Sequence, residues 1–315
     1  MCRIAVMLWS SHELRLNILS ASNIIVETGL AHMNNDTFIN GVKITDKRVL
    51  DEIRALYREH YNESDIEFIQ NFFNEIIDLF LGKKQGFLKC DTAYHDLSHT
   101  LQVVFVFLKI IRGWNRKENP SKISKEFLTI GIIAALLHDA GYLKTEDDAD
   151  GTGGKYTFIH IQRGIDFARR YLSLRGFKEN QIESVKNILT CTGLKIDYDA
   201  FPFYCKEERI IGYALGSADL VSQMAASNYP EKLPLLYREF EEAYRYEGIE
   251  KLEGAGALLF QSADDLMKKT PHFYENIVKE RLEKMGSMYT YLSDNSENPY
   301  IDAIEENIKR LKLKE

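Results

Sequence analysis

From about residue 45 to its end, this chain places apolar residues at helical rather than alternating intervals. The segment KRVLDEIRALYREHY carries one apolar stripe, formed by Val49, Ile53, Leu56 and Tyr57. The later segments keep this spacing, and we find neither a sustained alternating run nor a repeat of fixed length. We therefore predict an all-α fold with a single multi-helix domain.

Residues that favour helix ends support this interpretation. Asp46 can cap the first helix, and Gly82 can end the second. Ser121 or Ser124 can cap the helix that leads into IIAALLHDAGYL. Residues 1–40 show no firm period, so we expect an N-terminal extension of uncertain structure before a domain over residues 41–315.

Composition limits the partners and the compartment. The formal net charge of −7 disfavours binding to a nucleic-acid polymer, although a local pocket for a small phosphate is compatible with it. The four cysteines form no CxxC pair, which is typical of reduced thiols. The longest apolar stretch, residues 127–137, is too short to span a bilayer. We expect a cytoplasmic protein that does not bind membranes, and the sequence does not indicate its oligomeric state.

A histidine pair stands in the stretch YHDLSHT. His95 and His99 are four residues apart, so a helix that included both would present them on one face. Either the two imidazoles are satisfied core residues, or they take part in metal binding and acid chemistry. The pair alone favours neither interpretation.

A second polar pair follows a segment that is apolar on nearly every face. IIAALLHDAGYL predicts a buried helix that ends at His138 and Asp139, next to Gly141, where the chain can turn. Burying an ionised aspartate costs several kcal/mol, on the order of a lost charge pair, unless a cation or hydrogen bonds offset that cost. A divalent ion would do so; hydrogen bonds that close the helix end are the alternative.

A third candidate is the one carboxylate of the segment GYALGSADLVSQMA. Asp219 is expected to be either a metal ligand or a buried hydrogen-bond acceptor. Together with His99, His138 and Asp139 it completes a set of nitrogen and oxygen ligands without a thiolate. Such a set suits one or two divalent ions of Mn, Mg, Zn or Fe, with open positions for water.

The ordered motifs YHDLSH, LLHDAGY and SADL resemble the HD superfamily of metal-dependent phosphohydrolases. Within it, they are most similar to the catalytic domain of the class I cyclic-nucleotide phosphodiesterases. The resemblance implies four ligands to one ion, namely His99, His138, Asp139 and Asp219. It further implies that Asp139 bridges to a second ion where one is present.

The same resemblance implies a reaction. A metal-bound water would attack the phosphorus of a small phosphoester, and His95 would act as the general acid that protonates the leaving oxygen. The first candidate substrate is a cyclic nucleotide. The chain departs from the phosphodiesterase pattern in having Asp96 after the first histidine and Tyr142 and Leu143 where another histidine usually follows.

Two later residues could compensate for that missing histidine. His160 could join the second metal or the phosphate, and Arg163 could hold a phosphate oxygen or be a solvated charge. Two other classes of function stay open. One is an HD-fold di-iron oxygenase, which needs a further histidine ligand that we do not find. The other is a non-enzymatic sensor of a nucleotide or metal, for which His95 would not be required.

Overall fold

The computed structural model describes residues 38–61, 66–117, 122–194, 196–293 and 297–313. The expected extension, residues 1–40, lies outside them except for residues 38–40. The described chain begins with a hairpin of two short antiparallel strands, β1 (Phe38–Ile39) and β2 (Val42–Lys43). Ile39 also bridges to Ala226, which attaches the hairpin to the helical body.

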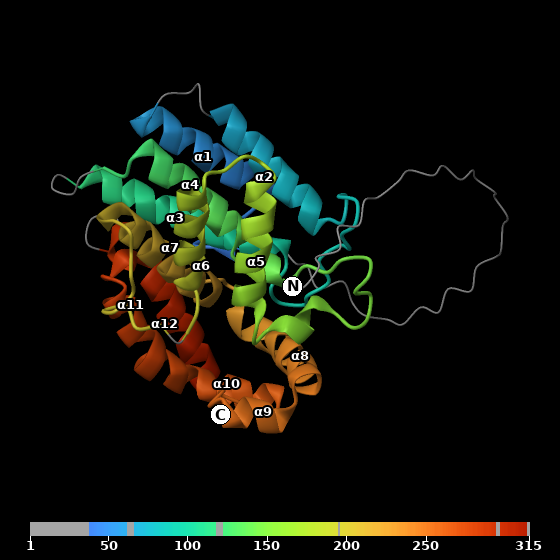
Figure 1. Cartoon of the computed structure of the whole chain (residues 1–315). Helices are drawn as coiled ribbons and strands as arrows, with labels where there is room; N and C mark the ends of the chain where they lie inside the picture. Colours follow the sequence, from blue (N-terminus) through green and yellow to red (C-terminus); the bar gives the residue numbers. More distant parts are fainter. Residues whose placement is uncertain (1–37, 62–65, 118–121, 195, 294–296, 314–315) are drawn as a thin grey trace, which may run out of the picture. The chain divides into compact units, whose positions relative to one another are not determined.

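All other regular elements of the described residues are helices (Figure 1). They are α1 (Asp46–His60), α2 (Ile66–Phe80), α3 (Leu97–Arg116), α4 (Lys125–Leu137), α5 (His160–Ser173), α6 (Glu179–Thr190), α7 (Lys206–Met224), α8 (Tyr229–Glu247), α9 (Ile249–Gly254), α10 (Ala263–Phe273), α11 (Lys279–Lys284) and α12 (Pro299–Lys312). The described residues belong to one compact unit, so the predicted all-α single domain is confirmed.

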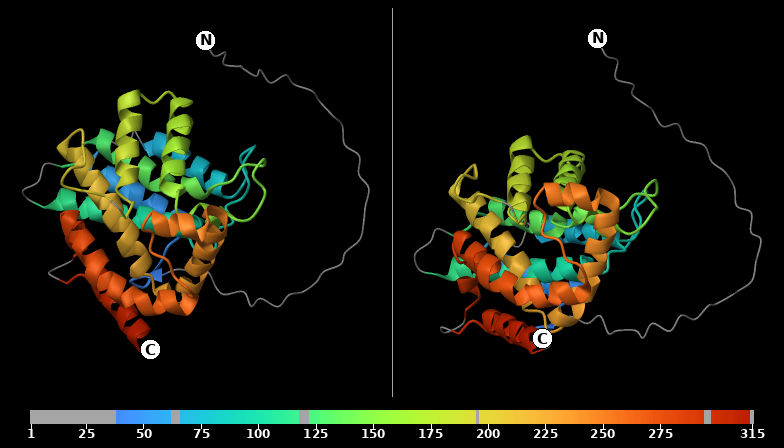
Figure 2. Two further views of the ribbon diagram at one scale, coloured as in Figure 1. Left: turned by 60° about the horizontal axis from the view of Figure 1, so that its bottom comes forward. Right: turned by 90° about the horizontal axis from the view of Figure 1, so that it is seen from below.

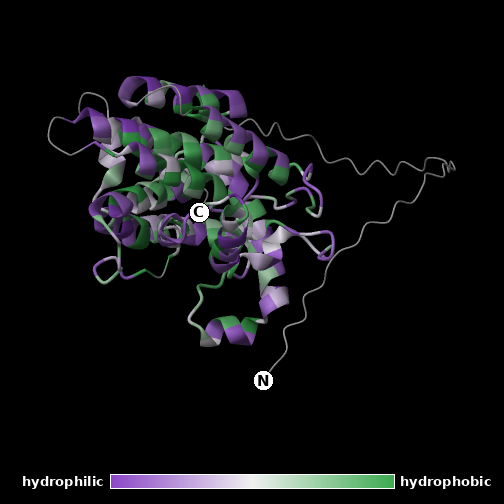
Figure 3. Ribbon diagram, turned by 45° about the horizontal axis from the view of Figure 1, so that its top comes forward, coloured by the Kyte–Doolittle hydropathy of each residue, from purple (hydrophilic) through white to green (hydrophobic). Residues whose placement is uncertain are grey.

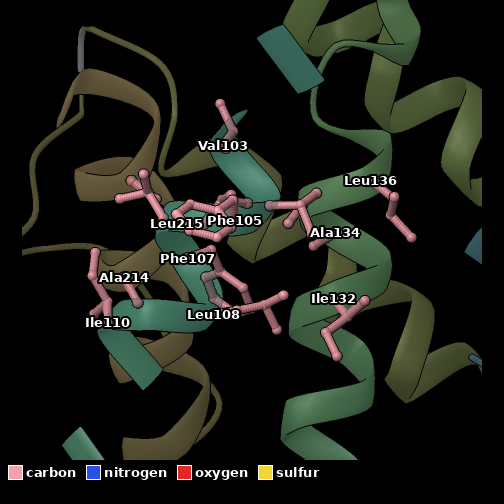
Figure 4. Close-up of a cluster of buried hydrophobic side chains, with 14 of the residues drawn as sticks. Val103, Phe105, Phe107, Leu108, Ile110, Ile132, Ala134, Leu136, Ala214 and Leu215 are labelled. Carbon is pink, nitrogen blue, oxygen red and sulfur yellow. The ribbon is translucent and has the colours of Figure 1, made fainter. Parts of the chain in front are cut away.

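Helices α3, α4 and α7 form the centre of the core. Figure 4 shows side chains of all three helices in one cluster, among them Phe107 of α3, Ile132 of α4 and Leu215 of α7. These three side chains are fully buried, and α4 is buried from residue 130 to its last residue. The expectation that this apolar segment is an internal helix is therefore confirmed.

The remaining helices surround this centre. Figure 2 shows α8 to α12, coloured orange to red, gathered on one side of it, where α10 contacts both α8 and α12. Figure 3 shows the usual division of an amphipathic bundle, with hydrophobic surfaces turned inward and hydrophilic ones outward. None of the described helices is long and apolar enough to cross a membrane.

The helix ends follow local capping chemistry, with one correction. Thr45, not Asp46, is the N-cap of α1, because its hydroxyl accepts a hydrogen bond from the backbone N–H of Arg48. Asp46 is the first residue inside the helix, where its charge favours the helix N-terminus. Ser124 caps α4, as one of the two predicted serines, and Gly82 adopts a φ of +69° just after α2.

Candidate metal centre

The start of α3 separates the two histidines of the YHDLSHT stretch. Asp96 has an extended backbone, and its carboxylate accepts a hydrogen bond 2.9 Å long from the backbone N–H of His99. Asp96 is thus the N-cap, and His95 lies before the helix, so the expectation of one shared helical face was wrong. The two imidazoles still meet, with ring centres 5.4 Å apart, because the chain turns at the cap.

The end of α4 presents the next two side chains. His138 is the C-cap, and Asp139 has left the helical conformation and leads into the 3₁₀ turn Ala140–Tyr142. A Cβ atom on Gly141 would lie 1.8 Å from the carbonyl oxygen of His160. Only glycine therefore lets α5 approach this turn so closely. This approach holds the end of α4 against the start of α5.

Four side chains from α3, the end of α4 and α7 converge at this point. Nε2 of His99 lies 3.3 Å from Oδ1 of Asp219 and 3.5 Å from Oδ2 of Asp139. Nε2 of His138 lies 3.2 Å from the same Asp139 oxygen. Within the described residues, two overlapping groups have the spacing to hold a metal ion: His95, His99 and Asp139, and His99, His138 and Asp219.

The orientation of these atoms suits a cation. Nδ1 of His138 lies 2.8 Å from the carbonyl oxygen of Ala135, so the proton of a neutral imidazole belongs there and Nε2 offers a lone pair. That Nε2 faces Nε2 of His99 at 3.5 Å. Oδ2 of Asp139 is buried and takes no hydrogen bond among the described residues. With His138 neutral, its Nε2 and Oδ2 of Asp139 are two acceptor atoms that face one another, which is a suitable environment for a metal ion.

The pKa values of the side chains show that this centre requires positive charge. Burial would raise the pKa of Asp139, but the neighbouring imidazoles, His138 first, hold it far below its usual range. Burial would lower the pKa of His138, yet the Asp139 and Asp219 carboxylates raise it to about 9. The two carboxylates therefore stay charged and require positive charge beside them, which either protons or a metal ion can supply.

His95 is held by a residue that the sequence did not point to. Oε2 of Glu239, on α8, lies 2.5 Å from Nδ1 of His95, and its other oxygen accepts the backbone N–H groups of Tyr94 and His95. Burial would lower the pKa of His95, but Glu239 outweighs that effect and raises it to about 9. His95 is therefore an oriented imidazolium, which is the protonation state a general acid requires.

Glu239 had no sequence signal of its own. It stands in LYREFEEAYRY, where Glu241 and Glu242 are equally acidic, and the motif pattern contains no residue of this helix. Its side chain is only 2% exposed, and this burial distinguishes it from the ordinary acidic residues of a solvated helix face.

His160 lies next to the centre, but it belongs to neither potential metal group. Its ring stacks on Tyr142 with ring centres 4.7 Å apart, and Tyr142 stacks in the same way on His95. Nδ1 of His160 lies 2.7 Å from the carbonyl oxygen of Thr157. Tyr142 therefore contributes an aromatic contact to both His95 and His160.

Arg163 contacts the backbone that follows Asp139. Its guanidinium donates to the carbonyl oxygens of Gly141 and Leu143, at 2.9 and 3.2 Å, and stacks on the ring of Tyr156. In this position it fastens α5 to the turn after α4. It is accordingly not a solvated charge, and two of its nitrogens are already engaged.

Comparison with curated proteins finds no match. A family model described as Npun_R2479-like matches residues 39–308, which contain the four convergent residues, His95 and Glu239. The match begins within the hairpin and ends in α12, so it spans the helical domain. This chain therefore belongs to the Npun_R2479-like family.

Proposed function

We propose that this protein is a metal-dependent phosphohydrolase that cleaves a small phosphoester, with a cyclic nucleotide as the first candidate substrate. The observation that carries the proposal is the convergence of histidine and aspartate side chains with metal-ligand spacing, among them a buried Asp139 oxygen without a donor, beside a histidine whose Nδ1 is held by Glu239. The converging histidine and aspartate side chains suit a metal ion, and the histidine held by Glu239 suits a general acid.

The proposed roles of the side chains follow from their positions. His99, His138, Asp139 and Asp219 would hold the ion. When bound, a divalent ion supplies Lewis acidity toward a phosphoryl oxygen and lowers the pKa of a coordinated water molecule. His95, with Nδ1 engaged by Glu239, keeps Nε2 as the atom that can deliver a proton to a leaving oxygen.

Exposure indicates how a substrate reaches this centre. The side chains of His99, His138 and Asp139 are at most 3% exposed, whereas His95 is 15% exposed and Asp219 is 17% exposed. The centre is therefore more exposed at His95 and Asp219 than at its other three side chains. A phosphoester would therefore be approached first by His95 and Asp219.

The test compares metal content and hydrolysis in purified variants. Elemental mass spectrometry should find about one or two Mn, Zn, Mg or Fe ions per wild-type chain and a loss of them in Asp139→Ala. Asp166→Ala, which alters an exposed carboxylate on α5, is the matched control and should keep the metal. His95→Ala should keep the metal and lose hydrolysis of phosphomonoesters or phosphodiesters in a substrate panel.

Other outcomes separate the alternative functions. A protein that cannot be loaded with any of these ions would overturn the proposal. Two iron ions per chain with substrate-dependent oxygen consumption would favour the oxygenase. A metal-loaded wild type that binds nucleotides without turnover, and whose binding is unchanged in His95→Ala, would favour the sensor.

A further inference from the structure

A lysine on α8 contacts Tyr94, whose ring neighbours two histidines of the candidate metal centre. We propose that Lys232 binds an anionic oxygen of the phosphoester held there, an inference that rests on the function proposed above. Lys232 would thus be a substrate-binding residue that neither the motif pattern nor the ligand set contains.

The position of Lys232 follows from two aromatic contacts. Its Nζ lies 5.9 Å from the ring centre of Tyr94. The ring of Tyr94 lies 5.0 Å from that of His95 and 6.0 Å from that of His99. The ammonium group therefore contacts the aromatic ring that itself neighbours both the proposed acid and a proposed ligand.

The helix that carries Lys232 also carries the partner of His95. Lys232 and Glu239 are seven residues apart on α8, which is two helical turns, so they lie on one face. Glu239 fixes the direction of that face, because its carboxylate contacts His95 and the backbone of Tyr94. The face of α8 that supports the acid thus also brings Lys232 to the ring of Tyr94.

The charge of Lys232 is uncommitted. Within the described part of the chain it forms no ion pair and no side-chain hydrogen bond, and it is only partly buried. Two other cations near the centre are engaged or inaccessible. Arg163 donates to two carbonyl groups, and Arg281 is 5% exposed and donates to the carbonyl of Cys191. An incoming anion therefore finds an available donor in Lys232.

Hydrogen bonds of Tyr94 connect this contact to a second proposed ligand. The hydroxyl of Tyr94 donates to the side-chain oxygen of Gln223, whose amide donates to the backbone oxygen of Asp219. This connection links Tyr94 to Asp219, which with His95 is one of the two more exposed side chains of the centre. Because three carboxylates, those of Asp139, Asp219 and Glu239, surround the centre, an entering anion needs compensating charge, and Lys232 supplies part of it.

The experiment measures binding of inorganic phosphate to the Mn²⁺-loaded protein by isothermal titration calorimetry. Lys232→Met should weaken phosphate binding roughly tenfold to a hundredfold, the effect expected for loss of a hydrogen bond from a charged group. Lys232→Arg should restore most of the affinity. Arg238→Met removes an exposed charge from the same helix and should leave the affinity unchanged. The metal content and melting temperature of each variant show whether the fold is intact.

The outcomes distinguish this inference from the proposed function. Equal affinity in wild type and Lys232→Met, with metal binding and hydrolysis intact, overturns the role of Lys232 and leaves the phosphohydrolase standing. Equal weakening in Lys232→Met and Lys232→Arg, together with a lower melting temperature, assigns Lys232 a structural role against Tyr94 and also overturns it. A metal-loaded wild type that neither binds phosphate nor hydrolyses esters overturns both.

Discussion

Oε2 of Glu239 lies 2.5 Å from Nδ1 of His95, although 144 residues of sequence separate them. This contact fixes the direction of the ring and supplies the negative charge that keeps it protonated. Glu239 is therefore a positioning residue for the proposed acid.

Replacing the Glu239 carboxylate should impair the acid step. In Glu239→Gln we expect kcat to fall about tenfold to a hundredfold, because part of the general-acid contribution is lost. His95 must be protonated to act, so activity falls as pH rises through its pKa. Removing the neighbouring charge lowers that pKa, and the decline should begin at a lower pH than in wild type.

Glu241→Gln is the matched control for this change, because Glu241 is paired with Arg245 on the exposed side of α8. Its pH–rate profile should superimpose on that of the wild type. An unchanged profile for Glu239→Gln would mean that His95 does not serve as the acid.

A bound metal should stabilise the fold measurably. At a free Mn²⁺ concentration of a hundred times Kd, the free energy of unfolding should rise by about 2.7 kcal/mol, and a chelator should reverse this. Asp139→Asn should abolish the stabilisation, because it removes the charge of a carboxylate that belongs to one potential metal group and lies 3.2 Å from Nε2 of His138 in the other. Thermal melts with and without metal provide the measurement, and a metal effect of equal size in the variant would argue against the site.

The close approach at Gly141 should make it intolerant of any side chain. Gly141→Ala places a Cβ atom 1.8 Å from the carbonyl oxygen of His160, so we expect a loss of about 3 kcal/mol or more in the free energy of unfolding. Gly254→Ala, in α9, meets no atom within 4 Å and should be neutral or slightly stabilising. Urea denaturation measures both, and a neutral Gly141→Ala would show that α5 can move away from the turn.

Two thiols should be unreactive in the folded protein. Burial raises the pKa of Cys191 to about 12 and that of Cys90 to about 11, so both are neutral thiols at pH 8. Iodoacetamide at pH 8 should modify neither of them until the protein is unfolded in urea. Peptide mass mapping checks this, and rapid alkylation of Cys191 under native conditions would contradict the packing around it.

The fold could be predicted from patterns of residues that are close together in the sequence. The helical spacing of apolar residues indicated the helices, and the continuous apolar run before His138 indicated the buried α4, because both depend on neighbours a few residues away. The N-cap of α1 moved by one residue, since Thr45 and Asp46 are both capable caps and the backbone conformation decides between them.

The ligand set was also accessible from local sequence, because short motifs place chemically distinctive residues at helix ends. His99 stood out by its spacing from His95, whereas His138, Asp139 and Asp219 stood out as polar residues in apolar segments, and the structure brings the four together. Their partners did not stand out. A glutamate in a run of acidic residues and a lysine in a polar helix look alike whether they face solvent or the centre.

The sequence by itself thus determined the all-helical domain and the residues able to hold a metal, since periodicity and burial cost are properties of short segments. Only the tertiary structure decided which charges act on that centre. The packing of α8 brings Glu239 to His95 and Lys232 to Tyr94, whereas the packing of α5 on the α4 turn directs Arg163 to backbone carbonyls. Such contacts join residues far apart in the chain, and their electrostatic consequences depend on distances that no local pattern encodes.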